Sequence, residues 1–230
     1  MNLTDILSPL DAAAILWFLV LVGGYRLIAG RGALRDRSIV GAVQLQRDQW
    51  MLTMAHRDNR LMDAILLNGL SQGNAFFAST SAIAIGGLAT ILGAGDRARA
   101  FFDNVPLASP MSPLLWEIKM LFLIGIFVFA FFEFAWAFRL THYSAIMLGA
   151  TPILDAGNEA ECVCYARRLA RLNGIMADHA NSGLRSFYLA VAAFAWFLHP
   201  VLFMIATAWV ILVLARRDFF SRSRTAIKGL

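Results

Sequence analysis

The feature that most constrains this chain is the apolar run LLWEIKMLFLIGIFVFAFFEFAWAF at residues 114–138. At 1.5 Å of rise per residue, a helix of this length crosses the roughly 30 Å of hydrocarbon in a bilayer. Inside lipid, a helix satisfies all of its own backbone hydrogen bonds. The run therefore predicts a transmembrane helix, with Glu117 and Lys119 near its outer boundary and the isolated acid Glu133 deep in its second half.

Three further apolar runs lie at residues 11–29, 74–94 and 186–215. The last is too long for an untilted single span and rather short for two. The hydrophobic fraction of the chain is 59%, above the roughly 45–50% that is usual for soluble domains. We therefore expect an all-α fold, a polytopic helical membrane protein with about four transmembrane spans. The whole chain, residues 1–230, is expected to form a single membrane domain.

Two segments between the spans, residues 38–70 and 150–185, mix polar and apolar residues. In the first, Trp50, Met54 and Leu61 are among the apolar residues that recur roughly at helical spacing. Segments of this kind favour amphipathic helices that lie on or beneath a membrane face. We expect both segments to form such helices on the cytoplasmic side.

Charge flanking the spans predicts their orientation. Arginines follow the first span, whereas the charges before it are acidic. Because short cytoplasmic loops are enriched in Lys and Arg, the N-terminus is expected on the periplasmic side of a bacterial inner membrane. Four spans would then place the C-terminal tail outside as well, yet this tail is rich in arginine. Residues 186–215 are therefore either one long span kinked at Pro200 or a re-entrant hairpin that turns at His199-Pro200.

Four residues within the spans are candidates for an intramembrane polar or proton site. A carboxylate in a span costs roughly 2.5–3.5 kcal/mol on insertion scales, so Glu133 should face protein, water or a partner. It is either a structural acid that snorkels to the interface or pairs with Arg139, or one half of a proton relay with His199, whose imidazole changes charge near neutral pH. Ser79 and Thr80 in the second span could line the same path.

The second span has a high content of small residues. They are Ala75, Ala78, Ser79, Ser81, Ala82, Gly86, Gly87 and Ala89. Small residues allow membrane helices to approach closely, and such contacts hold bundles together in lipid. The pattern favours a helix–helix interface, with a polar lining for a path through the membrane as the alternative.

Polar residues also gather at the cytoplasmic ends of the predicted spans. Asn59, Arg60 and Asp63 precede the second span, and Asn181 and Arg185 precede the last. They could tether helices to one another, or close a vestibule that binds an anion or a lipid headgroup. Arginine suits the second role because its planar guanidinium matches phosphate geometry.

Common catalytic and ligand-binding motifs are missing from the sequence. The histidines show neither HExxH nor paired CxxC spacing, so we expect no metal site and no cofactor. No phosphate-binding loop, dinucleotide fingerprint or nucleophile elbow is present, and no catalytic residue is assigned. The net charge is +5, but the arginines flank apolar spans instead of forming one patch, so a nucleic-acid partner is not expected.

Two stretches resemble a known family. RDNRLMDAILLNGLSQGNAFFASTSAIAIGGLATIL at residues 57–92 and NSGLRSFYLAVAAFAWFLHPVLFMIAT at residues 181–207 resemble the domain of unknown function 599 family of integral membrane proteins, found in bacteria and plants. The resemblance extends from about Ala29 to Phe219. It implies a mostly helical membrane protein with about four spans and no assigned activity.

The sequence thus indicates an integral inner-membrane protein of unknown activity. Our first hypothesis is a non-enzymatic helical bundle that self-associates, or joins a membrane-protein partner, through the small residues of its second span. The alternative is a small oligomeric channel or proton-coupled carrier that uses Glu133 and His199. In both, the bilayer is a partner of the chain.

Overall fold

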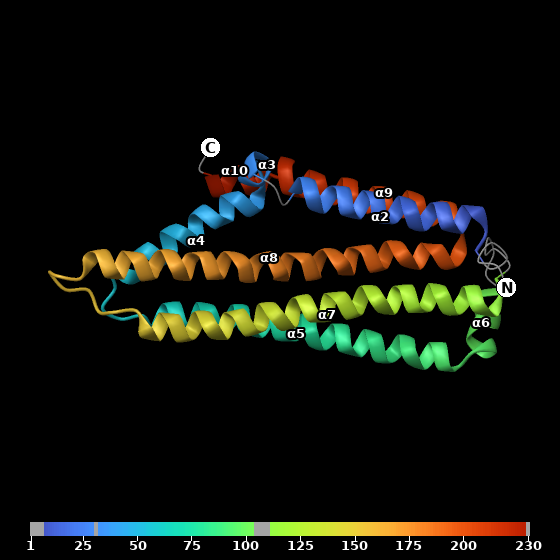
Figure 1. The fold of residues 1–230 in the computed structure, drawn as a ribbon, viewed down its shortest axis with the longest axis horizontal. Coiled ribbons are helices and arrows are strands. Elements are labelled where there is room, and N and C mark those ends of the chain that lie inside the picture. The colour runs from blue at the N-terminus through green and yellow to red at the C-terminus, as the bar shows by residue number, and fades with distance from the viewer. Residues whose placement is uncertain (1–6, 30–31, 104–110, 229–230) are drawn as a thin grey trace.

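The computed structural model describes residues 7–29, 32–103 and 111–228, and every regular element in these ranges is a helix. Four helices are long and apolar enough to cross a membrane. They are α2 (Pro9–Ala29), α5 (Leu61–Gly93), α7 (Pro113–Ala150) and α9 (Pro200–Phe220). They lie side by side along the long axis of the molecule (Figure 1). The predicted all-α membrane fold is confirmed, and the chain is an integral membrane protein.

A fifth long helix, α8 (Glu159–Leu198), settles the structure of residues 186–215. Proline has no backbone N–H and favours an extended residue before it. Accordingly α8 ends at Leu198, His199 is extended (φ −158°, ψ 139°) and α9 begins at Pro200. The chain reverses there, and α9 returns along α8 (Figure 1). The segment belongs to a hairpin of two long helices, and the expected alternative of one kinked span is wrong.

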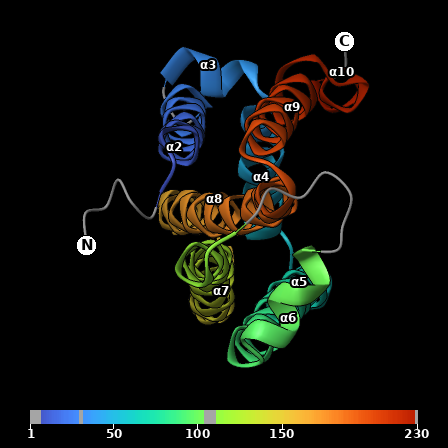
Figure 2. The ribbon, with the colours of Figure 1, turned by 90° about the vertical axis from the view of Figure 1, so that its right-hand side faces the viewer.

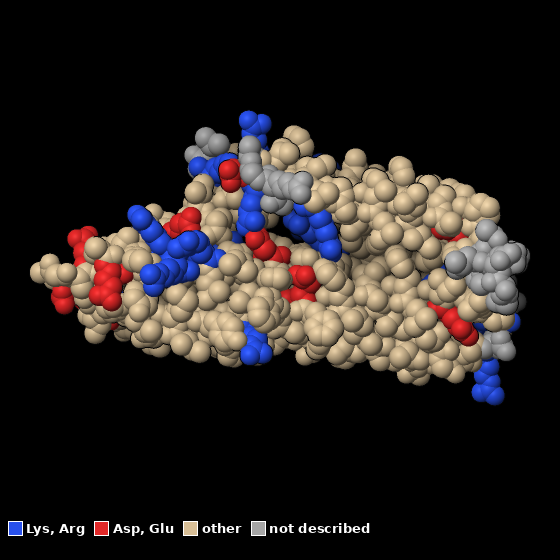
Figure 3. Space-filling model, viewed as in Figure 1, with Lys and Arg blue, Asp and Glu red and all other residues tan. Residues whose placement is uncertain are grey.

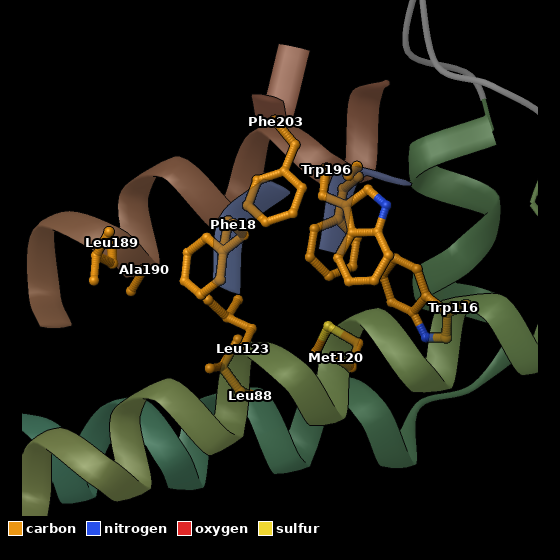
Figure 4. Packing of buried hydrophobic residues seen from close by; sticks show 12 residues of the cluster. Phe18, Leu88, Trp116, Met120, Leu123, Leu189, Ala190, Trp196 and Phe203 are labelled. Atoms are coloured by element: carbon orange, nitrogen blue, oxygen red, sulfur yellow. The ribbon is translucent and has the colours of Figure 1, made fainter. Parts of the chain in front are cut away.

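The last turns of α8 lie in the same layer as the four candidate spans. One hydrophobic cluster combines α2, α5, α7, α8 and α9. Its buried members are Ala14, Phe18, Leu88, Trp116, Met120, Leu123, Leu189, Ala190, Ala193, Trp196, Phe197 and Phe203. The Phe203 ring stacks on both Phe18 (centroids 5.4 Å apart) and Trp196 (5.4 Å), which joins the hairpin to α2 (Figure 4).

A second cluster lies at the end of the bundle where α4 (Ile39–Ala55) packs against α8. It includes Met51, Met54, Leu67, Leu148 and Leu169. The segments expected as cytoplasmic helices supply α4 and the first turns of α5 and α8. Those first turns are not separate surface helices, because α5 and α8 continue without a break into the apolar layer.

Helix α8 lies at the centre of the molecule. Viewed along the bundle, α2 and α9 lie on one side of α8, and α7 and α5 on the other (Figure 2). Close contact with α7 depends on Gly183, because a Cβ there would lie 2.6 Å from the buried ring of Phe134. Short helices α3 (Gly32–Arg37), α6 (Asp96–Asp103) and α10 (Arg222–Lys228) complete the described chain.

Candidate functional site

Two adjoining cavities lie where α2 and α9 end and α4 begins. Their volumes are about 290 Å³ and about 180 Å³, and both are lined by Val40, Asn181 and Arg185. Charged side chains gather around a hollow in this part of the surface, between α2–α3 and α8 (Figure 3). We call the two cavities together the vestibule.

The vestibule is lined by five arginines and two aspartates. These are Arg26, Arg35, Arg47, Arg185, Arg217, Asp178 and Asp218. Each aspartate already has a basic partner: Arg35 Nη2 lies 2.6 Å from Asp178 Oδ2, and Arg185 Nη2 lies 2.8 Å from Asp218 Oδ2. The Tyr25 hydroxyl also donates a hydrogen bond to Asp218. Two of the five arginines are therefore ion-paired within the vestibule.

The remaining three arginines make other contacts. The Arg26 guanidinium lies 4.6 Å from the centroid of the Phe129 ring, and Arg217 Nη1 donates to the Tyr188 hydroxyl over 3.2 Å. Burial lowers the pKa of Arg47, an effect that nearby Asp178 opposes. Among the described residues, no ion pair includes Arg26, Arg47 or Arg217. Arginine remains protonated under all ordinary conditions, so the vestibule is positively charged.

Glu133 lies close to this region. Its Oε2 is 3.0 Å from Nδ1 of His179 on α8, and its side chain is 17% exposed. The carboxylate also attracts Arg26 electrostatically. Among the described residues, no ion pair joins Glu133 to Arg139, and Arg139 Nε donates to the Tyr143 hydroxyl over 2.7 Å. Glu133 thus joins α7 to α8 beside the vestibule.

His199 lies far from Glu133. It forms the turn between α8 and α9, where its Nδ1 accepts a hydrogen bond from the Val201 backbone N–H over 3.1 Å. About 20 residues of continuous helix separate it from His179, the partner of Glu133, which corresponds to roughly 30 Å. The structure does not bring the two members of the expected relay together, and His199 instead caps α9.

Ser79 and Thr80 do not meet Glu133 either. Ser79 is exposed, and the Thr80 hydroxyl donates to the Phe76 carbonyl of its own helix over 2.9 Å. Helix α5 meets α7 through Phe77, whose ring stacks on Phe134 at 5.1 Å. Among the described residues, no hydrogen bond joins Ser79 or Thr80 to Glu133.

The expected cytoplasmic polar cluster divides into two groups. In the first, Arg60 donates to the Thr151 and Pro152 carbonyls beyond the end of α7. Asp63 is fully buried and accepts from Trp50 Nε1 (2.7 Å) and Arg57 Nη1 (2.6 Å). Asn59 Oδ1 accepts from the Leu61 N–H. This group tethers α4, α5 and α7.

The second group, Asn181 and Arg185, lines the vestibule. Arg26, Arg35 and Arg217 were interpreted from sequence only as topology signals, and the other charged lining residues, Arg47, Asp178 and Asp218, were not singled out. Arginine recurs in segments that flank the apolar spans. This recurrence is the sequence signal that could have indicated the site. Sequence alone does not show that these ends meet.

A buried polar network near the opposite end of α2 was also missed. Lys119 and Asp11 are 2% and 3% exposed, and Lys119 Nζ lies 3.8 Å from Asp11 Oδ1. Lys119 donates to the Trp196 carbonyl over 2.8 Å, and Trp196 Nε1 donates to Asp11 over 2.8 Å. The network links α2, α7 and α8.

Comparison with known proteins identifies a family but no characterised relative. A family model described as a protein of unknown function, DUF599, matches residues 13–223. No curated protein and no solved structure matches the chain. Since the match covers most of the sequence and accords with the membrane helices, the chain belongs to the DUF599 family of proteins of unknown function.

Proposed function

We propose that this protein is a non-enzymatic membrane protein that binds a phosphate-bearing anion in the vestibule. The observation that carries the proposal is the charge of the cavity: five arginines line it, and its two aspartates are already paired. A cavity that holds unpaired positive charge attracts an anion to complete its pairing. The proposal concerns binding, with no chemical step.

The type of arginine contact favours phosphate. A guanidinium presents N–H donors in a planar fork that binds two phosphate oxygens at once. The Arg26 guanidinium lies against the Phe129 ring, and Arg217 donates to the Tyr188 hydroxyl. Their charges are therefore positioned before an anion arrives. Partial enclosure strengthens the attraction, because the effective dielectric constant there is lower than in water.

We place the vestibule on the cytoplasmic side of a bacterial inner membrane. The arginines that follow α2 and those that follow α9 lie at the same end of these two helices. Positive charge flanking spans favours the cytoplasm, so this arrangement supports a periplasmic N-terminus. A cytoplasmic vestibule would be open to soluble phosphates and to the headgroups of the inner leaflet.

Pyrophosphate binding provides the test. A ligand that binds only the folded protein at 100 times its Kd stabilises that protein by about 2.7 kcal/mol. We expect pyrophosphate to raise the Tm of the wild-type protein in mild detergent. The double variant Arg26→Gln/Arg217→Gln should lose most of that rise, because both substitutions remove charge from the vestibule.

The matched control is Arg167→Gln, which removes an exposed arginine from α8 outside the vestibule. It should keep the wild-type response and thereby separate local binding from a change in net charge. An equal pyrophosphate response from the control and the double variant would contradict the proposal. So would a wild-type protein whose Tm does not respond.

A second candidate function, self-association, is supported by the outer face of α5. Ser79, Ala82, Gly86 and Thr90 are exposed and follow one another at three- and four-residue spacing. A Cβ added at Gly86 would meet nothing within 4 Å. Several of the small residues that predicted a helix interface are thus exposed within one copy, and a second copy of α5 could pack closely against them.

Mass measurement in mild detergent tests this second function. We expect a dimer or larger oligomer for the wild type, and a lower oligomer fraction for Gly86→Leu, because a leucine would separate the two backbones. Gly149→Leu, at an exposed glycine near the end of α7, is the control. A wild-type protein that stays monomeric at high concentration, in detergent and in lipid nanodiscs, would contradict it.

A further inference from the structure

An apolar groove lies in the membrane layer beside the vestibule. Its volume is about 320 Å³, and α2, α7 and α8 supply its walls. Val22, Phe122, Gly125, Ile126 and Leu189 are among the residues that line it. α2 and α7 lie on either side of α8, which places this groove along the side of the bundle (Figure 2). A groove on this side would face the acyl chains of the bilayer.

Groove and vestibule meet at Arg26, which lines both. Arg26 is the last residue of α2 to line the groove, and Phe129, beneath its guanidinium, is the last from α7. Phe18 and Phe122 line the opposite end of the groove on the same two helices. The groove therefore runs lengthwise into the apolar layer and has its positive charge at one end.

We infer that groove and vestibule together hold one anionic phospholipid of the bilayer. Its phosphate lies against Arg26 and the neighbouring arginines of the vestibule, and one acyl chain lies in the groove. This inference rests on the proposed function, because it identifies the anion as a lipid headgroup. The combination of an apolar slot and an arginine cluster matches an amphiphile, whereas a soluble phosphate would need only the vestibule.

The groove and the vestibule contribute differently to binding of the lipid. An acyl chain is already surrounded by hydrocarbon in the bilayer, so moving it into the groove provides little hydrophobic gain. Close fit in the groove fixes the position of the chain. Selectivity comes from the headgroup, because basic residues near a membrane surface attract anionic lipids over zwitterionic ones. The site should therefore discriminate by charge.

Gly125 allows the groove to be filled without disturbing the helix. A Cβ at this position would meet nothing within 4 Å, and the residue lines the groove. Gly125→Leu would place its side chain where the acyl chain is expected. Val22→Phe, introduced from α2, would fill the same space from the opposite wall. Gly69→Leu, at an exposed glycine of α5 outside the groove, is the matched control.

Native mass spectrometry of the full chain in mild detergent tests the inference, with phosphatidylglycerol and phosphatidylcholine as probes. We expect the wild type and Gly69→Leu to retain one phosphatidylglycerol at concentrations at which phosphatidylcholine is lost. Gly125→Leu and Val22→Phe should each retain it at least tenfold less, yet keep the Tm response to pyrophosphate. Arg26→Gln/Arg217→Gln should lose both the lipid and the pyrophosphate response.

Two results would overturn the inference: equal retention of the two lipids by the wild type, or wild-type retention by both groove variants. If pyrophosphate still raised the Tm in an arginine-dependent way, the proposed function would stand and only its lipid assignment would fail. If arginine-dependent binding of both probes were absent, both proposals would fail. The pyrophosphate response also shows that each groove variant is folded.

Discussion

Replacing Lys119 with methionine is expected to lower the free energy of unfolding by about 3–5 kcal/mol, because it leaves the Asp11 carboxylate buried without its cation. Asp11 is 3% exposed, and its Oδ1 lies 3.8 Å from Lys119 Nζ. Methionine matches the length of the lysine stem, so the change removes charge and hydrogen bonding more than packing. Unfolding of the purified protein in mild detergent measures the loss.

A second contact of Lys119 adds to this cost. The Trp196 carbonyl lies in the last turn of α8, where the helical donor four residues ahead would be Pro200, which has no N–H. Lys119 Nζ donates to this carbonyl over 2.8 Å and so replaces the missing helical bond. Methionine would leave the carbonyl without that donor, and an unsatisfied buried acceptor is itself destabilising.

The control for this prediction is the double variant Asp11→Asn/Lys119→Met, compared with each single change. Removing both charges of a buried pair is often nearly neutral, whereas removing one is costly. We therefore expect the double variant to be more stable than Lys119→Met alone. Additive losses, or a Lys119→Met protein as stable as the wild type, would show that the pair contributes nothing measurable.

Reporter proteins fused at the two ends of α9 are expected to lie on opposite sides of the membrane. Helix α9 has 21 residues and is among the helices long and apolar enough to cross a bilayer. Arginines lie near its end at positions 216 and 217 and follow it at positions 222 and 224, and positive charge favours the cytoplasm. A green fluorescent protein fused after Leu230 should fluoresce, whereas one fused to a chain truncated after Leu198 should not.

A cytoplasmic C-terminus together with a periplasmic N-terminus requires the chain to cross the membrane an odd number of times. The last half of α8 packs in the same cluster as the four candidate spans, which makes five passages of that layer. A fusion after Ala150, at the end of α7, serves as the cytoplasmic control. If the fusions after Leu198 and Leu230 reported the same side, α9 would not cross the membrane. The arginine-rich tail would then be an exception to the charge rule.

The sequence predicted those helices that follow from the length of a continuous apolar run. The run at residues 114–138 lies within α7, the run at 11–29 lies within α2, and the run at 74–94 ends one residue beyond α5. The hairpin was harder to predict from sequence, because α8 combines a polar first half with an apolar second half. Its apolar part alone was too short to identify as a span, and only the turn at Pro200 shows that two helices are present.

The candidate site was less predictable, because side-chain partners come from distant parts of the chain. Glu133 could be identified as unusual from its place in an apolar run. Its partner could not, since His179 is 46 positions away on another helix. Asn181 and Arg185 line the vestibule, whereas Arg60 and Asp63 make their contacts between α4, α5 and the end of α7. The sequence does not show the distance between these two sets of residues.

The long apolar runs are enough to predict membrane helices, because an unpaired backbone is costly in lipid and a helix pairs its own backbone groups. Which charged side chains meet depends on how the helices pack. The arginines of α2, α4 and α9 come together because α8 packs between helices that end at the same level. Apolar length is a local property, whereas a binding site depends on the distances between segments that the sequence does not specify.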